Sequence, residues 1–314
     1  MRYHTANLCA LALAITALFT AAVHAEDISR EFEVVDGGRL EIDIESGGIK
    51  VQVGESNVVR VTVQVRGANA DQFELDFRQR GGEIRVRGRT PGKHKRYNNR
   101  DLAVEVRAEV PRRFDLKLDT SGGSIEVGDV DGEVDADTAG GSIVVGRVTG
   151  PVRADTAGGS IEVVASVKDV DADTAGGSID QGEIQGSIKA ATAGGSIRVE
   201  RALGRSRLST AGGSITVKDA RAGVVADTVG GGIKVDFMAQ PSDRSRLDTT
   251  GGSITVGIVE GLGFDLDATS GSRIRSAFPV DDDEDDPERL HGPLNGGGPE
   301  LEISSSGRVR IEKR

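Results

Sequence analysis

Apolar and polar residues alternate with a period of two along most of the chain, as they do in half-buried β-strands. Val134, Ala136 and Thr138 share one face, and the residues between them are polar. A Gly-Gly pair follows, and a second alternating stretch begins at Ile143. The pattern predicts two short strands joined by a tight corner, in which we expect the glycines to supply a positive φ.

This unit recurs in tandem along the chain, with a signature close to Asp-Thr-Ala-Gly-Gly-Ser-Ile. Its threonines are Thr120, Thr138, Thr156, Thr174, Thr192, Thr210 and Thr228. An eighth copy from Asp248 follows a three-residue insertion, and a degenerate ninth begins at Ala268. One unit cannot bury its own apolar face, so the regular spacing predicts coils stacked in parallel register, Ile on Ile and Thr on Thr. The predicted fold is all-β, a single-stranded parallel β-helix or β-solenoid with about 18 residues per coil.

A three-sided helix built from hexapeptides has the same period but requires an apolar residue at every sixth position. Counting from Ile125, the sixth and twelfth residues are Asp131 and Asp137, which argues against it. We instead expect each coil to end at a weaker apolar corner, ten residues after its threonine. This corner is occupied by Val130, Val148, Ile184 and Met238 in four of the copies.

The N-terminal segment 1–25 is typical of a secretory signal peptide. An apolar run from Leu8 to Phe19 precedes the small residues Val23 and Ala25, which suit a signal peptidase. The run is shorter than the roughly 20 residues that cross a bilayer. We therefore expect cleavage after Ala25, export to the periplasm or cell surface, and no membrane-spanning segment. Cys9 would leave with the signal, so disulfides would not stabilise the mature chain.

The pattern divides the chain into five segments. These are a signal peptide (1–25), irregular N-terminal β coils or a cap (26–115), the regular repeats (116–275), an acidic Gly/Pro-rich loop (276–300) and C-terminal closing strands (301–314). In the last segment, charged residues would blunt the open edge of the solenoid.

The formal net charge is −11, and loss of Arg2 with the signal would make it −12. An acidic protein of this kind is not expected to bind nucleic acid. The mature chain would keep two histidines, His94 and His291, both in expected loops, and it has no HExxH or GxSxG motif. We therefore predict no catalytic residues, no cofactor and no metal site.

Two charged segments are candidate binding surfaces. The basic one comprises Arg85, Arg87, Arg89, Lys93, Lys95 and Arg96. It could bind an anionic polysaccharide or lipid, although alternation with Ile84 and Val86 also fits a solvated strand face. The acidic run 281–286 could bind a divalent cation, but it lacks the spacing of an EF-hand loop and fits a solvated insertion better.

Register stacking would also align the aspartates that precede the threonines, including Asp119, Asp137, Asp155 and Asp173. Like charges directly opposite each other destabilise a sheet. The outward positions two residues earlier carry mixed signs, for example Lys117 and Arg153, and should offset part of the repulsion.

The tandem Thr-Ala-Gly-Gly-Ser-Ile units resemble a bacterial family of secreted, adhesin-type proteins with GGSI repeats, related to the head domains of auto-transporter adhesins. The resemblance covers roughly residues 30 to 314. It implies a parallel β-helical fold, a cell-envelope location and an adhesive or structural role, and it brings no catalytic residues.

The favoured function is a non-enzymatic exported scaffold or adhesin whose partner is an envelope polysaccharide, lipid or protein. One alternative is a β-helix enzyme acting on polysaccharide, which would use clustered carboxylates in a groove. Another is a cation- or ice-binding repeat surface built on the threonine ladder, which would require exposed threonines. The sequence leaves the oligomeric state open.

Overall fold

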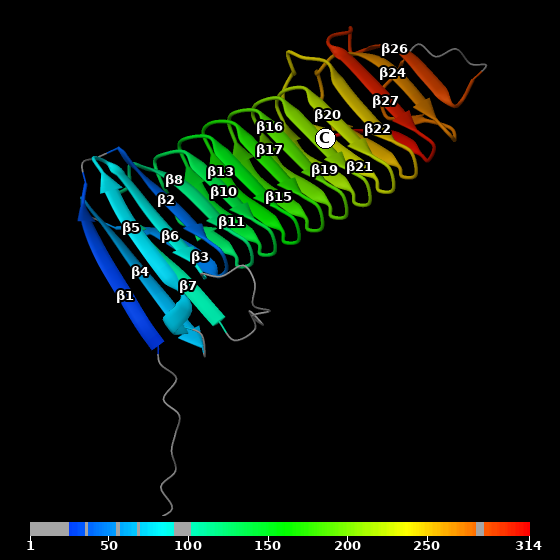
Figure 1. The fold of residues 1–314 in the computed structure, drawn as a ribbon. Coiled ribbons are helices and arrows are strands. Elements are labelled where there is room, and N and C mark those ends of the chain that lie inside the picture. Colours follow the sequence, from blue (N-terminus) through cyan, green and yellow to red (C-terminus); the bar gives the residue numbers. More distant parts are fainter. Residues whose placement is uncertain (1–24, 35–36, 55–56, 68–69, 91–101, 281–285) are drawn as a thin grey trace, which may run out of the picture.

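The computed structural model describes residues 25–34, 37–54, 57–67, 70–90, 102–280 and 286–314. Within these residues the protein is a rod of two 14-stranded sheets, here called sheet A and sheet B, which face each other along its length (Figure 1). One short 3-10 helix, η1 (Ala70–Gln72), is the only helical element in the described part. The predicted all-β solenoid is confirmed. The predicted signal peptide lies outside the described residues, except for Ala25.

Each regular coil gives one strand to each sheet. In a central coil, β14 (Val170–Thr174) lies in sheet B and β15 (Ile179–Ile184) in sheet A. β14 pairs in parallel with β12 (Val152–Thr156) and β16 (Ile188–Thr192), and their three threonines lie side by side. The predicted coil length and the stacking of like residues are confirmed, and a coil of two sides rules out the three-sided hexapeptide helix.

The other regular coils repeat this arrangement. Sheet B contains β8 (Phe114–Thr120), β10 (Val134–Thr138), β18 (Ser206–Thr210), β20 (Val224–Thr228) and β22 (Ser245–Thr249). Sheet A contains β9 (Ile125–Val127), β11 (Ile143–Val148), β13 (Ile161–Ser166), β17 (Ile197–Ala202), β19 (Ile215–Ala220), β21 (Ile233–Phe237) and β23 (Ile254–Ile258).

The core is a thin layer between the sheets. Buried Ile, Val, Leu, Ala and Thr alternate with solvent-facing residues, as predicted. The weaker corner residues Val148 and Ile184 are buried, but Met238 is 42% exposed, so the prediction for Met238 is wrong. Phe237 fills the corner instead, because the register between β19 and β21 shifts so that Phe237 lies beside Ala220.

The threonines form a buried ladder that joins one coil to the next. The Thr174 hydroxyl donates to the carbonyl oxygen of Gly159 in the preceding coil at 2.8 Å and lies 3.3 Å from the Gly177 backbone nitrogen, whose N–H it accepts. Thr138, Thr156, Thr192, Thr210 and Thr228 make the same pair of bonds. Buried threonines rule out an ice-binding face built on this ladder.

The glycine pairs allow close contact between coils rather than a positive φ. Gly158 and Gly159 are not among the residues with positive φ, so that prediction is wrong for the regular copies. A Cβ on Gly159 would lie less than 3.0 Å from the carbonyl oxygen of Gly141, whereas a Cβ on Gly158 would meet its nearest neighbour, the oxygen of Gly140, at 3.5 Å. The second glycine is therefore required because stacked backbones leave no room for a side chain.

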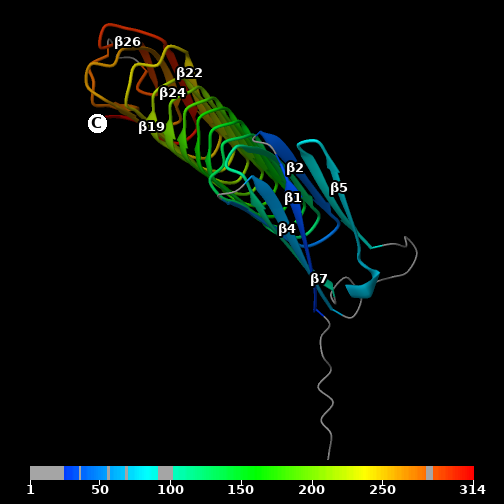
Figure 2. The same cartoon turned by 90° about the vertical axis from the view of Figure 1, so that its left-hand side faces the viewer.

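The N-terminal segment contains one coil and a two-sheet extension. The coil consists of β2 (Gly38–Ile44) and β3 (Gly48–Val53), which pair in parallel with β8 and β9. β7 (Leu102–Val110), β4 (Val58–Gly67) and β1 (Ala25–Glu33) continue sheet A, while β6 (Glu83–Arg89) and β5 (Glu74–Arg80) continue sheet B. Figure 2 shows the β5 hairpin at the outer end of its sheet.

The C-terminal strands do not lie at the end of the rod. β27 (Glu300–Ser305) pairs with β22 on one side and with β24 (Phe264–Ser270) on the other. β28 (Val309–Lys313) lies between β23 and β25 (Arg275–Ser276). β26 (Arg289–Leu294) covers β24 and forms the outer edge, inside the segment predicted to be only a loop. The prediction that residues 301–314 close the end is therefore wrong, because they insert between the eighth and ninth copies.

Candidate functional site

The described residues contain no arrangement of three or more His, Cys, Asp or Glu side chains that could hold a metal ion. The same part of the chain has no helix long and apolar enough to cross a membrane.

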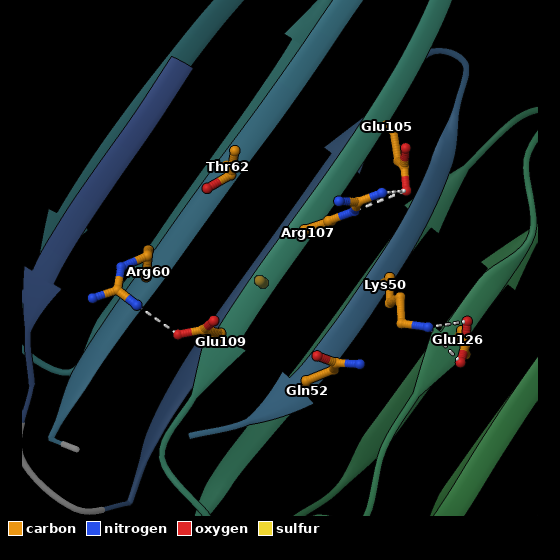
Figure 3. A pocket seen from close by; sticks show the side chains of 9 residues that line it. Lys50, Gln52, Arg60, Thr62, Glu105, Arg107, Glu109 and Glu126 are labelled. Atoms are coloured by element: carbon orange, nitrogen blue, oxygen red, sulfur yellow. Dashed lines mark hydrogen bonds and ion pairs between the residues drawn. The ribbon is translucent and has the colours of Figure 1, made fainter. Parts of the chain in front are cut away.

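A polar groove lies on the outer face of sheet A, where the antiparallel extension meets the first coil (Figure 3). It has a volume of about 530 Å³ and is open to solvent along one side. Its lining comes from β3, β4, β7 and β9, and comprises Lys50, Gln52, Arg60, Thr62, Glu105, Arg107, Ala108, Glu109 and Glu126. We call this the sheet A groove.

Every charged side chain in the sheet A groove has an opposite charge beside it. Lys50 bonds Glu126 at 2.8 Å, and Arg107 bonds Glu105 at 2.8 Å. Arg60 contacts Glu109 at 2.7 Å, and outside the groove it bonds Glu31 at 2.8 Å. The hydrogen bond to Glu31 is the main reason that the pKa of Arg60 is raised above its ordinary value.

This arrangement is suited to binding through hydrogen bonds. The three cations and three carboxylates balance, so the groove favours neither an anion nor a cation. Guanidinium, ammonium and amide groups donate, and carboxylates accept, from fixed positions on strands. Among the lining residues there is no histidine, cysteine or serine that could act as a nucleophile or proton shuttle.

The described part of the predicted basic surface is largely neutralised. Arg85 approaches Glu41 at 2.6 Å, and Arg89 approaches Asp43 at the same distance. Arg87 lies 3.8 Å from Asp43. All three arginines point outward from β6 toward carboxylates of β2, which agrees with the alternative of a solvated strand face. Lys93, Lys95 and Arg96 lie outside the described residues.

Residues 281–285 of the acidic run also lie outside the described residues. Of the run, Asp286 alone is described, and it lies 3.8 Å from Arg289. The cation-binding alternative therefore remains a prediction.

The aspartate ladder on sheet B has the register expected from the repeat. Asp119 lies between Asp43 and Asp137, and Asp155 between Asp137 and Asp173. Burial, followed by the neighbouring carboxylates, raises the pKa of Asp119 above its ordinary value. Burial also raises the pKa of Asp155, although Arg153 at 2.6 Å opposes the shift. The mixed-sign positions thus offset the repulsion only in part.

The sequence did not reveal the sheet A groove. Its residues come from four strands, of which only two belong to the repeat pattern. Apolar and charged residues alternate along 102–110, but nothing in the sequence pairs that segment with residues 48–53.

Comparison with solved structures finds several proteins of low sequence identity. A proposed lipid binding protein from Parabacteroides distasonis aligns with 91% of this chain and 96% of its own, at 14% identity and a TM-score of 0.37. A proposed adhesin from Bacteroides fragilis aligns with 92% of this chain and 97% of its own, at 9% identity and a TM-score of 0.33. These similarities are too weak to carry a functional argument, and the comparison with curated proteins finds no match.

The family comparison is informative over most of the rod. The model of the Toastrack DUF4097 domain, a domain of unknown function, matches residues 39–307. This range runs from the first coil to the inserted C-terminal strands. The chain therefore belongs to the Toastrack DUF4097 family.

Proposed function

We propose that this protein is a non-enzymatic, exported scaffold of the cell envelope that binds polysaccharide through the sheet A groove. The observation that supports this most directly is the groove itself, a balanced array of hydrogen-bonding side chains held on strands. Hydroxyl-rich sugars need many donors and acceptors but little net charge, and the groove offers that composition. The signal peptide predicted at 1–25 would export the chain.

The rest of the surface supports a scaffold more than an enzyme. The strands of both sheets repeat every coil, and many of their outward charges form ion pairs between neighbouring strands, such as Lys189–Asp171 at 3.0 Å. A polysaccharide-cleaving enzyme would need two carboxylates converging on one bond. The carboxylates of the groove instead form ion pairs with cations. The lining of the groove has no aromatic ring to stack on a sugar, so the groove would bind sugar weakly.

The proposal is tested with the purified chain from residue 26 to 314 on an array of envelope polysaccharides, lipids and cell-wall fragments. We expect selective, saturable binding to a neutral polysaccharide. Replacing Lys50 and Arg107 with alanine should reduce it at least tenfold. The matched control is Arg198→Ala, which removes a similar exposed pair with Asp180 in the middle of the rod and should leave binding unchanged.

The predicted basic surface is tested in the same assay with Arg85→Ala and Arg87→Ala. A preference for anionic lipid or polysaccharide that these changes abolish would move the site from sheet A to β6. If the folded protein bound nothing on the array, the proposal of polysaccharide binding would be overturned and a protein partner would be favoured.

A further inference from the structure

The N-terminal edge of sheet B is open. β5 is the outermost strand of this sheet and pairs only with β6, so alternate backbone N–H and C=O groups point away from the molecule. β5 contains no proline or glycine. The edge strand at the other end, β26, contains both Gly292 and Pro293, which hinder the addition of another strand. The two ends of sheet B therefore differ in their capacity to accept a strand.

The charges of β5 are self-complementary. Glu74 and Asp76 are followed by Arg78 and Arg80, all on the solvent face, because the alternate side chains, including Phe77, pack toward the core. Two β5 strands paired antiparallel about a two-fold axis at Phe77 would place Glu74 opposite Arg80 of the second copy. The same axis places Asp76 opposite Arg78 of the second copy. All four charges of each strand then face an opposite charge.

Within one chain these charges are incompletely satisfied. Arg78 bonds Asp76 of its own strand at 2.7 Å, but it also lies directly opposite Arg85 of β6. Glu74 lies opposite Arg89 of β6 and Arg80 lies opposite Glu83, but neither couple approaches closely enough to form an ion pair. Arg78, Arg80 and Arg85 line a hollow of about 140 Å³ with a single carboxylate. A second β5 would bring the missing carboxylates to this hollow.

The same axis would cover the apolar end of the core. Leu75 and Phe77 are only partly buried, and the Phe77 ring stacks on Phe32 of sheet A at 6.3 Å between centroids. Directly opposed residues of an antiparallel pair have Cβ atoms about 4.5–5.5 Å apart. The two Phe77 rings would therefore meet at the axis and continue the core from one molecule into the other.

The edge of sheet A is protected against such pairing. β1 carries only acidic charges along its outer face, at Asp27, Glu31 and Glu33, so this strand is not self-complementary. Arg30 lies opposite the buried Val61 and so places a charge on the core side of the edge. Inward charges of this kind hinder strand addition. At the N-terminal end of the rod, strand addition is therefore favoured at β5 over β1.

We infer that two copies of this chain associate through antiparallel pairing of their β5 strands, about a two-fold axis at Phe77. The dimer is a longer rod with a continuous sheet B, and the two ends that carry β26 point outward. It carries two sheet A grooves, which would strengthen binding to a repetitive surface by avidity. The dimer itself does not depend on the groove binding sugar.

Sedimentation equilibrium of the chain from residue 26 to 314 tests the inference. We expect a monomer–dimer equilibrium in the micromolar range, weakened by salt because charges contribute. Arg78→Glu with Arg80→Glu makes β5 wholly acidic, and Glu74→Lys with Asp76→Lys makes it wholly basic. Each double variant should be monomeric. An equimolar mixture of the two should form a heterodimer, because every opposed pair is then attractive.

A control shows whether the effect is specific to β5. Lys189→Glu with Arg207→Glu changes the net charge as much as the acidic variant does, on regular strands of the same sheet, and should leave the dimer intact. A wild-type chain that stays monomeric up to about 0.1 mM would overturn the inference. So would a dimer that both reversals leave unchanged, or two monomeric variants that do not associate when mixed although circular dichroism shows them folded.

Discussion

The second glycine of each corner allows a stringent test of the fold, because its neighbour in sequence is a natural control. In Gly159→Ala the new Cβ would lie less than 3.0 Å from the carbonyl oxygen of Gly141. The carbonyl oxygen belongs to the backbone of one coil, and the new Cβ is attached directly to the backbone of the next. Neither atom can therefore move without separating the two coils. The substitution must therefore disturb the contacts that join these coils.

The cost follows from the contacts of the Gly159 peptide. Its N–H donates to the Thr156 hydroxyl at 3.3 Å, and its carbonyl accepts from the Thr174 hydroxyl at 2.8 Å. Loss of each bond costs about 1 kcal/mol. Forcing an extra methyl group into a packed site adds about 1–3 kcal/mol. We expect Gly159→Ala to lower the free energy of unfolding by about 3–5 kcal/mol.

The control is Gly158→Ala, for which the nearest heavy atom lies 3.5 Å from the new Cβ, an ordinary contact. This change should alter stability by less than about 1 kcal/mol, since alanine also restricts the unfolded chain. Urea unfolding of both variants, followed by far-UV circular dichroism, gives the comparison. Equal losses in the two variants would refute the argument that close approach of the coils explains the second glycine.

Substitutions at three further positions address individual ladders, each measured by urea unfolding. Thr174→Val leaves the Gly159 carbonyl without its buried donor and should cost about 1–3 kcal/mol, whereas Thr174→Ser keeps the hydroxyl and should cost less. Asp119 has a raised pKa, so its charge opposes folding at neutral pH and the cost fades as the pH falls through that pKa. Asp119→Ser should therefore stabilise the protein by about 0.2–1 kcal/mol at pH 7 and by less in acid. Gln181 is buried with both amide atoms unpaired, so Gln181→Val, the residue at this position in neighbouring coils, should stabilise by about 1–3 kcal/mol; a loss of stability would contradict this account.

The sequence predicted the regular coils well because their contacts repeat with the same period as the residues. Thr174 bonds to the preceding coil at a fixed separation in sequence. The spacing of the threonines therefore directly encodes the pairing of the strands. The alternation of apolar and polar residues then indicates which face of each strand points into the core. The chemistry of the corner was harder to predict, because a positive φ and a close backbone approach both select glycine. Only the positions of the neighbouring coils distinguish the two causes.

The ends and the groove could not be predicted in this way. Residues 102–110 pair with 48–53 and 58–67, and no repeated motif links these segments. The sequence of residues 305–310, Ser-Ser-Gly-Arg-Val-Arg, resembles the corner and second strand of a repeat. Their place between the eighth and ninth copies depends on a chain reversal that the spacing does not encode. The sheet A groove arises from the first of these non-local pairings and was therefore invisible in the sequence.

The insertion of the C-terminal strands explains why the two ends of the rod differ. In the described part of the chain, the ninth copy pairs with the regular stack through β27 and β28, so β24 has no parallel neighbour until β27 is in place. β26 then covers β24 with an antiparallel strand that carries Pro293. This end is complete within one chain. The N-terminal end has no equivalent cover on β5, and it is there that a self-complementary strand occurs. The asymmetry gives the rod one closed end and one end suited to a second copy.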